Sequence, residues 1–210
     1  MASSRAPDLL IFPYNGNGLE ALDCLGPAWR FVGFVDDTPV KQGRNTHGHR
    51  VCGREMFAQE PEARVLAVPG SASSYRARKA IIEGLGIGLD RFAQIIHPAA
   101  HVSPMARIGR NVLIMAGVVV TSNAVIGDHV CVLPNSVIHH DTVIGDWTLI
   151  GSNVTIAGGT TLGENCYVGS GSSVMNGLRL GDRCLIGLGS CVIQDVGADT
   201  TVAGCPARTI

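Results

Sequence analysis

The sequence predicts a small α/β domain at the N-terminus, followed by a column of stacked, three-sided coils of parallel β-strands. Three observations indicate this fold class. Every sixth residue from Val102 to Val192 is aliphatic, without an insertion, and the first hundred residues alternate short apolar segments with Gly-rich loops and helical segments. The composition agrees, because 27 glycines and only 5% aromatic residues among 210 indicate many tight turns around small branched side chains.

The six-residue register determines the prediction for the C-terminal half. All 16 register positions are aliphatic, and the residue four places after each is small or β-branched in 15 cases, the exception being Leu178. An α-helix has about 3.6 residues per turn and cannot repeat every six, whereas short strands joined by tight corners can. We therefore expect each hexapeptide to form one side of a prism, with the aliphatic side chain inside and the small one near a corner.

Glycine and cysteine positions follow the same register. Glycine comes directly after the aliphatic residue in eight repeats, for example at Gly109, Gly127 and Gly145. We expect these glycines to adopt corner dihedral angles that other residues avoid. Three hexapeptides close one coil, so Cys166 and Cys184, which are three repeats apart, should stack in successive coils. This packing explains their spacing without a metal or a disulfide.

The first hundred residues predict three strands and two helices in β-loop-α order. The apolar segments 8–12, 29–35 and 64–68 predict strands, and segments 19–26 and 75–83 predict helices. This order indicates a small parallel sheet. We therefore divide the chain into an α/β domain over residues 1–96 and the β-column with its C-terminal tail over residues 97–210.

A Gly-rich loop after the first strand suggests nucleotide binding. The run Asn15-Gly16-Asn17-Gly18 would let backbone N–H groups approach a phosphate at a helix N-terminus, and Asp36, at the end of the second strand, could accept a ribose hydroxyl. An ordinary β–α turn can also carry this motif. The domain has room for only half of a dinucleotide fold, so a mononucleotide-linked ligand fits better than a dehydrogenase cofactor.

Charge and hydropathy exclude other classes of protein. The chain has 16 basic and 17 acidic side chains, a net charge of −1, whereas nucleic-acid binders usually carry a basic surplus. No apolar run approaches the roughly 20 residues that span a bilayer, and the first residues lack the apolar core of a secretory signal. Seven cysteines without a C-x-x-C pair suit a reducing compartment. We expect a cytoplasmic protein without membrane insertion or nucleic-acid binding.

The repeat pattern [LIV]-G-x-x-[STAV]-x resembles the hexapeptide repeat of left-handed parallel β-helix proteins, and the handedness is implied by that resemblance. Together with Asn15-Gly16-Asn17-Gly18, Val35-Asp36-Asp37, Ile96-His97-Pro98 and the segment from Ala203 to Arg208, the whole chain resembles the NeuD/PglD-type bacterial sugar acyltransferases. The resemblance implies a Rossmann-like domain that binds a nucleotide-linked amino sugar. It also implies a β-helix that binds acetyl-CoA in a cleft between subunits of a homotrimer, and a role in surface-glycan synthesis.

The family's catalytic motif matches the segment from Val137 to Asp141, with His140 as the base and Asp141 as its acidic partner. The register agrees with this role, because Ile138 points inward and His140, two residues later, falls at a corner. Imidazole titrates near neutrality and can accept the proton that an amine loses as it attacks a thioester. A solvated turn histidine is the alternative. His139 occupies the usual glycine position and is given no direct role.

The remaining site residues are carried over from the resemblance alone. Substrate contacts match Asn15, Gly16, Asn17, Asp36, Asp37 and Gly70. Cofactor contacts match Gly158, Ser170 and Leu188, through backbone amides that face the thioester and pantetheine, and Arg208, which could meet a phosphate. Three departures stand out: Pro13 replaces a loop glycine, the segment 70–78 is longer, and Leu149 replaces a histidine that contacts the cofactor. No metal is expected.

Four functions are compared. The first is transfer of the acetyl group of acetyl-CoA to a UDP-, GDP- or dTDP-linked amino sugar; the second is O-acetylation of a sugar or sialic acid. A metal hydrase of the γ-carbonic-anhydrase type needs three histidines on facing coils, and His101, His129, His139 and His140 lack the required spacing. A non-catalytic trimeric binding module would be unaffected by removal of His140.

Overall fold

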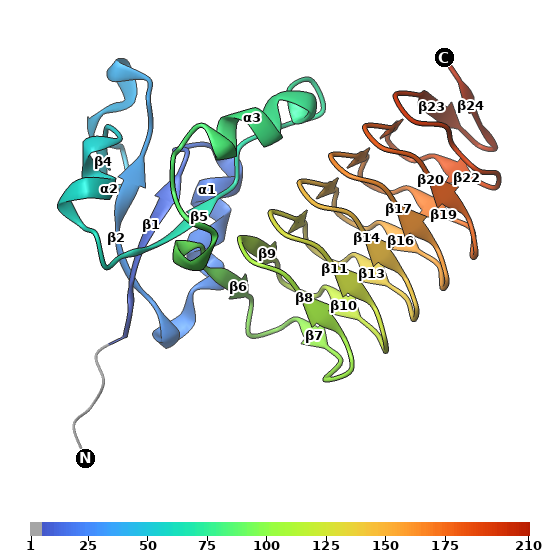
Figure 1. The fold of residues 1–210 in the computed structure, drawn as a ribbon, viewed down its shortest axis with the longest axis horizontal. Coiled ribbons are helices and arrows are strands. Elements are labelled where there is room, and N and C mark those ends of the chain that lie inside the picture. Colours follow the sequence, from blue (N-terminus) through green and yellow to red (C-terminus); the bar gives the residue numbers. More distant parts are fainter. Residues whose placement is uncertain (1–5) are drawn as a thin grey trace.

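A five-stranded α/β sheet is followed along the chain by a β-helix whose strands form three parallel sheets (Figure 1). The computed structural model describes residues 6–210. The succession of an α/β region and a regular run of parallel hexapeptide strands confirms the predicted fold class, a Rossmann-like subdomain before a left-handed β-helix.

The α/β sheet has the strand order β3-β4-β2-β1-β5, and only the pairing of β3 with β4 is antiparallel. Its strands are β1 (Asp8–Phe12), β2 (Arg30–Val35), β3 (Gly43–Arg44), β4 (Arg50–Cys52) and β5 (Arg64–Ala67). The three predicted strands are confirmed to within one residue at each end. The sequence did not predict β3 and β4, because the segment 41–50 is rich in charge and glycine and has no apolar alternation.

The helical segments are short. They are α1 (Gly16–Glu20), α2 (Glu55–Gln59) and α3 (Arg78–Glu83), with 3₁₀-helices η1 (Ala21–Cys24), η2 (Gly26–Ala28), η3 (Pro39–Lys41), η4 (Tyr75–Ala77) and η5 (Leu89–Arg91). The helix predicted over 75–83 is confirmed as η4 and α3. The helix predicted over 19–26 begins earlier, at Gly16, because the Asn15 side chain accepts the N–H of Gly18 at 2.7 Å and caps α1.

The β-helix has three sheets, named here I, II and III, and the chain visits them in that order in each coil. Sheet I contains β7 (His101–Val102), β10 (Val119–Val120), β13 (Val137–Ile138), β16 (Thr155–Ile156), β19 (Ser173–Val174) and β22 (Cys191–Val192). Sheet II contains β8 (Arg107–Ile108), β11 (Val125–Ile126), β14 (Val143–Ile144), β17 (Thr161–Leu162) and β20 (Arg179–Leu180). Sheet III contains β6 (Gln94–Ile96), β9 (Val112–Ile114), β12 (Cys131–Val132), β15 (Leu149–Ile150), β18 (Tyr167–Val168), β21 (Leu185–Ile186), β23 (Thr201–Gly204) and β24 (Ala207–Thr209).

The predicted register is confirmed. Neighbouring strands pair at an offset of three hexapeptides, for example Val120 with Ile138 and Ile138 with Ile156. Ile138 and Ile156 are 0% exposed in the prism core, and the small residue Thr142, four places after Ile138, is also buried. Cys166 and Cys184 both lie in this core with free thiols, as their spacing of one coil predicted.

The predicted reason for the glycines after the aliphatic residues is wrong. None of the eight has a positive φ; instead, a Cβ on Gly145 would lie 2.4 Å from the carbonyl oxygen of Gly163 in the next coil. These glycines therefore allow close approach of successive coils. The left-handed corner conformation falls two residues later, where φ is 59° at Asn123 and 69° at Gly159.

The two parts of the chain join through consecutive hydrogen bonds. Ala93 donates its N–H to the carbonyl of Val65 in the α/β sheet, and β6, directly after it, pairs with β9 of sheet III. The β-helix thus begins at Gln94, within the residues that the predicted division assigned to the first domain. The signal was available, since Ile96 is aliphatic and lies one repeat before Val102.

Candidate active site

His140 and Asp141 lie at the corner between sheets I and II, after β13. The Nδ1 of His140 is 2.7 Å from Oδ2 of Asp141, and Nδ2 of Asn123 donates to the other carboxylate oxygen at 3.0 Å. Hydrogen bonds from His140 and Asn123 hold the pKa of Asp141 below its ordinary value. With Nδ1 directed at the carboxylate, Nε2 is the nitrogen that can accept a proton. The His140 side chain is 61% exposed, so a ligand can reach it.

Gly158 lies one coil beyond His140 and directly against its ring. A Cβ at this position would lie 2.6 Å from Nε2 of His140, so glycine is needed to leave the imidazole in place. The N–H of Gly159 donates to the carbonyl oxygen of His140 at 2.9 Å, which fixes the two coils together. The structure therefore brings together the predicted base and one predicted cofactor residue.

The predicted substrate loop lies at the start of α1. Asn15 has a structural role, because its side chain caps α1 and also donates from Nδ2 to the carbonyl oxygen of Val68 at 3.3 Å. Gly18 must be glycine, since a Cβ there would lie 2.5 Å from the carbonyl oxygen of Pro13. Gly16 has open space around its Cα, and Asn17 lines a pocket.

Asp36 and Asp37 follow β2 and differ in environment. The Asp36 carboxylate is 2% exposed; it accepts the N–H groups of Tyr14 and Thr38 and pairs with Lys41 at 3.0 Å. Burial alone would raise the pKa of Asp36, but the hydrogen bonds from Thr38 and Lys41 outweigh it and keep the pKa below its ordinary value. Asp37 is exposed and accepts two hydrogen bonds from Arg54, both at 2.7 Å. Direct contact of either aspartate with a sugar nucleotide stays a prediction.

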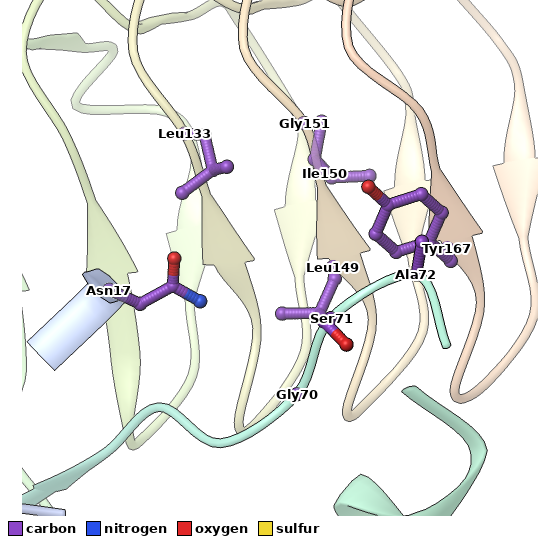
Figure 2. Close-up of a pocket in the computed structure, with 9 residues that line it drawn as sticks. All are labelled: Asn17, Gly70, Ser71, Ala72, Leu133, Leu149, Ile150, Gly151 and Tyr167. Carbon is purple, nitrogen blue, oxygen red and sulfur yellow. The ribbon is translucent and has the colours of Figure 1, made fainter. Parts of the chain in front are cut away.

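A pocket of about 210 Å³ opens between the α/β domain and sheet III. Its walls are mostly apolar, with Asn17, Ser71 and Tyr167 as polar side chains (Figure 2). Gly70, which has a φ of 113°, passes so close to Leu149 that a Cβ on it would lie 3.0 Å from Cδ1 of the leucine. The position at which Leu149 replaces the family histidine therefore forms part of this pocket.

Two of the other predicted cofactor residues, Ser170 and Leu188, lie at the corner between sheets III and I. Ser170 follows β18, and its Oγ accepts the N–H of Ser152 from the preceding coil at 3.0 Å. Leu188 occupies the same place one coil later and is 73% exposed. Arg208 is exposed in β24, where it pairs with Ala203.

Within one chain the predicted residues fall on two different corners of the prism. The pair His140 and Asp141 shares the I–II corner with Gly158, whereas Ser170 and Leu188 share the III–I corner. Asn17 and Gly70 meet in the pocket over sheet III. These residues nevertheless lie at the same height along the column. His140 directly follows β13, and the pocket residue Leu149 belongs to β15 of the same coil.

Comparisons with known proteins match the hexapeptide repeats and the fold of the whole chain. The model of the bacterial transferase hexapeptide (six repeats) matches residues 105–139 and 123–158, and that of the hexapeptide repeat of succinyl-transferase matches residues 177–203. The acetyltransferase domain of PglB from Neisseria gonorrhoeae, in complex with acetyl coenzyme A, is 25% identical with a TM-score of 0.84, covering 97% of this chain and 98% of that one. The chain is a hexapeptide-repeat acyltransferase.

Two further structures extend the comparison for this acyltransferase. PerB from Caulobacter crescentus, in complex with CoA and GDP-perosamine, is 25% identical with a TM-score of 0.82, and 97% of each chain is covered. WeeI from Acinetobacter baumannii is 23% identical with a TM-score of 0.82, covering 97% of this chain and 99% of that one, and supports the fold. No curated protein sequence matched the chain.

The acyltransferase holds its two parts together by a buried polar contact that the sequence did not predict. Arg78 is 0% exposed and donates to the carbonyl oxygens of Pro69 and His129, the latter at 2.7 Å. Asn111 bonds both to the backbone of Ala67 and to Nδ1 of His129, at 3.0 Å for the latter. Burial lowers the pKa of Arg78 to about 10, and burial together with Arg78 lowers the pKa of His129. Because Arg78 and Pro69 flank the pocket loop, these contacts support the pocket.

A signal for part of this contact was present in the sequence. His129 and Trp147 occupy the left-handed corner position that Asn, Asp or Gly fills in most other repeats, with φ of 61° and 58°. The rings stack at 5.6 Å, and Phe92 meets His129 edge-on at 5.0 Å. Bulky side chains at such a position indicate that a neighbouring element covers that corner.

Among residues 6–210, no group of three or more His, Cys, Asp and Glu side chains is arranged to hold a metal ion. Over the same residues, no helix has the length and hydropathy needed to cross a membrane.

Proposed function

We propose that this acyltransferase moves the acetyl group of acetyl-CoA to the amino group of a nucleotide-linked amino sugar. The observation that carries the proposal is the His140–Asp141 pair, whose Nε2 lies against Gly158 on an exposed corner. Two relatives at 25% identity over almost the whole chain support it, one with acetyl-CoA and one with CoA and GDP-perosamine.

The chemistry follows from the groups at this corner. The amine nitrogen of the sugar attacks the thioester carbonyl carbon, a C–N bond forms, and the C–S bond breaks to release CoA. Nε2 of His140 takes the proton that the amine loses, and Asp141 stabilises the imidazolium through Nδ1. The released sulfur takes that proton and leaves as the thiol. A backbone N–H at Gly158 is the nearest candidate to stabilise the oxyanion of the tetrahedral intermediate.

The proposal includes assembly as a homotrimer, with a site shared between neighbouring chains. Within one chain His140 and the pocket occupy different sides of the prism but the same level. Four valines, at 119, 125, 137 and 143, face outward from sheets I and II beside the His140 corner, and Val143 is 39% exposed. A second copy packed on these valines with its column parallel would bring its pocket level with His140. Sedimentation of the purified protein tests this part of the proposal.

The function is tested by a CoA-release screen. The purified protein is incubated with acetyl-CoA and UDP-, GDP- and dTDP-linked amino sugars, and free thiol is measured. Acetyl transfer to one of them, giving a product that resists mild base as an amide does, supports N-acetylation. A base-labile ester would show O-acetylation, and unchanged ligand binding without any turnover would favour a non-catalytic module.

A further inference from the structure

The pocket between the α/β domain and sheet III contains a hydroxyl whose role is not explained by the fold. Tyr167 points outward from β18, since its neighbour Val168 is the inward residue, and its ring lines the pocket beside Leu149 and Gly151. Figure 2 shows the hydroxyl directed toward Ile150 and Gly151 on the pocket wall. Among residues 6–210 this hydroxyl has no hydrogen-bond partner, and it is not one of the buried unpaired side-chain atoms, so it is open to the space within the pocket.

The neighbouring tyrosine provides a direct contrast. The ring of Tyr75 lies 5.9 Å from that of Tyr167, and its hydroxyl donates to the carbonyl oxygen of Arg183 at 2.9 Å and accepts from Arg76 at 3.0 Å. Tyrosine hydroxyls that are removed from bulk water usually find such a partner. The hydroxyl of Tyr75 therefore has a structural role. The ring of Tyr167 packs beside it, but the hydroxyl of Tyr167 is free to bond a ligand.

The lining and size of the pocket favour binding of the acceptor sugar over binding of acetyl-CoA. Its lining includes Asn17 and Gly70, two of the predicted substrate residues, whereas the four predicted cofactor residues lie outside it. Leu149, where the family has a histidine that contacts the cofactor, marks the wall at which the acceptor and the acetyl group of the cofactor would meet. Its volume of about 210 Å³ is smaller than the roughly 300–1,000 Å³ of pockets that enclose a whole drug-sized ligand, so it takes one end of a longer molecule. The side chains of Leu133 and Leu149 offer an apolar surface to the C–H face of a sugar ring.

We propose that the Tyr167 hydroxyl donates a hydrogen bond to a hydroxyl oxygen of the acceptor sugar and so helps to select it. This inference rests on the proposed function and names a specificity-determining residue for it. The packing of Tyr167 against Tyr75 and Leu149 holds the ring before the ligand arrives, which limits the entropy lost on binding.

The experiment compares Tyr167→Phe with Tyr75→Phe, which removes the same atom from the neighbouring ring. The acceptor is the nucleotide-linked amino sugar that the wild-type protein turns over in the CoA-release screen. A neutral hydrogen bond contributes roughly 0.5–1.5 kcal/mol, so Tyr167→Phe should raise KM for the acceptor about 3- to 10-fold. The Kd of acetyl-CoA, the kcat and the Tm should stay unchanged. Tyr75→Phe should instead lower Tm and leave KM within about twofold.

Monodeoxy analogues of the acceptor sharpen the result. For the analogue that lacks the bonded hydroxyl, wild type and Tyr167→Phe should have equal KM values. An unchanged acceptor KM in Tyr167→Phe, or a change confined to the Kd of acetyl-CoA, would overturn the assignment of Tyr167 while leaving the proposed function intact. Absence of turnover by the wild-type protein with every sugar would instead overturn the proposed function, and this inference with it.

Discussion

The β-helix and the α/β domain place their side chains by different means. In the β-helix, Ile138 packs between Val120 and Ile156, each one coil away, and its position follows from the register alone. In the α/β domain, the loop before α3 is held by Arg78. Its partner His129 is 51 residues away along the chain, at a corner of the β-helix. The repeat thus supplies a regular scaffold, whereas the shape of the pocket depends on a few contacts between the α/β domain and the β-helix.

Replacement of the base on the β-helix should give the largest effect. We expect His140→Ala to lower kcat/KM by about 10²–10⁴-fold, because it removes the group that accepts the amine proton. The pocket on the other side of the chain should be unaffected, so the Kd values of both substrates should change little. His139→Ala is the matched control and should retain activity in the CoA-release assay. Wild-type rates in His140→Ala would contradict the assigned role.

Removal of the Arg78 hydrogen bonds that join the α/β domain to the β-helix should give the next largest effect, a loss of stability. Arg78→Met fits the buried space but leaves the carbonyl oxygens of Pro69 and His129 without their donor. Each unpaired buried group costs roughly 1–3 kcal/mol, so for two such groups we expect a loss of about 2–6 kcal/mol in the free energy of unfolding. Urea denaturation followed by tyrosine and tryptophan fluorescence measures this loss. Arg107→Met, on the outward face of sheet II, is the control and should lie within about 0.5 kcal/mol of wild type.

Two glycines within the β-helix test the two reasons for glycine at its corners. A Cβ on Gly163 would lie 2.7 Å from the backbone nitrogen of Asp182, so Gly163→Ala should cost about 1–3 kcal/mol through overpacking. Gly177 has a φ of 73° with open space around it, and the equivalent position in other coils is filled by Asn123 or Asn135. Gly177→Asn should therefore change stability by less than about 1 kcal/mol. Thermal unfolding compares them, and equal losses would contradict the distinction.

The segment after β2 contains the buried ion pair of Asp36 with Lys41, and this pair can be weakened by a substitution of equal side-chain volume. Asp36→Asn keeps the side-chain volume but removes the charge that pairs with Lys41. We expect KM for the sugar nucleotide to rise about 3- to 10-fold, through loosening of the segment around Tyr14, while calorimetry gives an unchanged Kd for acetyl-CoA. Asp199→Asn, at the exposed ion pair with Arg183 in the β-helix, is the control. A change confined to acetyl-CoA would contradict the roles given to the two parts.

The smallest effect is expected from pH. Asn111 donates to Nδ1 of His129, a bond that needs the neutral imidazole, and the pKa of His129 is lowered below its ordinary value of 6.5. The unfolded chain binds this proton more readily, so stability is complete above about pH 6.5 and declines as pH falls below it. Unfolding of wild type and His129→Gln between pH 5 and pH 8 should show a weaker pH dependence in the variant. An identical slope would exclude His129 as the cause.

The register let the sequence predict most of the β-helix, because each inward position is recognised by one aliphatic residue. Gly158 lies one full coil after His140 in this register, and the structure places it directly against the imidazole, a contact that was not predicted from the sequence. The left-handed corners were missed, although asparagine and glycine recur at that position.

The pocket could not be predicted from the sequence, because it exists only where the α/β domain meets sheet III. A partial signal was present on that sheet. The outward residues of four successive strands, Leu113, Cys131, Leu149 and Tyr167, are apolar or aromatic, which indicates a covered face. Which residues cover it depends on Asn17, the loop 70–72 and the Arg78 contact, and these come from segments without a regular pattern.

The C-terminal end of the column has a consequence for the solubility of the protein. There the pairing of Ile186 with Val202 spans less than a full coil of three hexapeptides, and the last strand, β24, runs antiparallel to β23. Figure 1 places this end away from the α/β domain. A stack of parallel strands with an open edge can recruit another chain and grow into a fibre. In sheet III the antiparallel strand β24 occupies that edge. A further parallel strand from another chain therefore cannot pair with β23 and extend the column there.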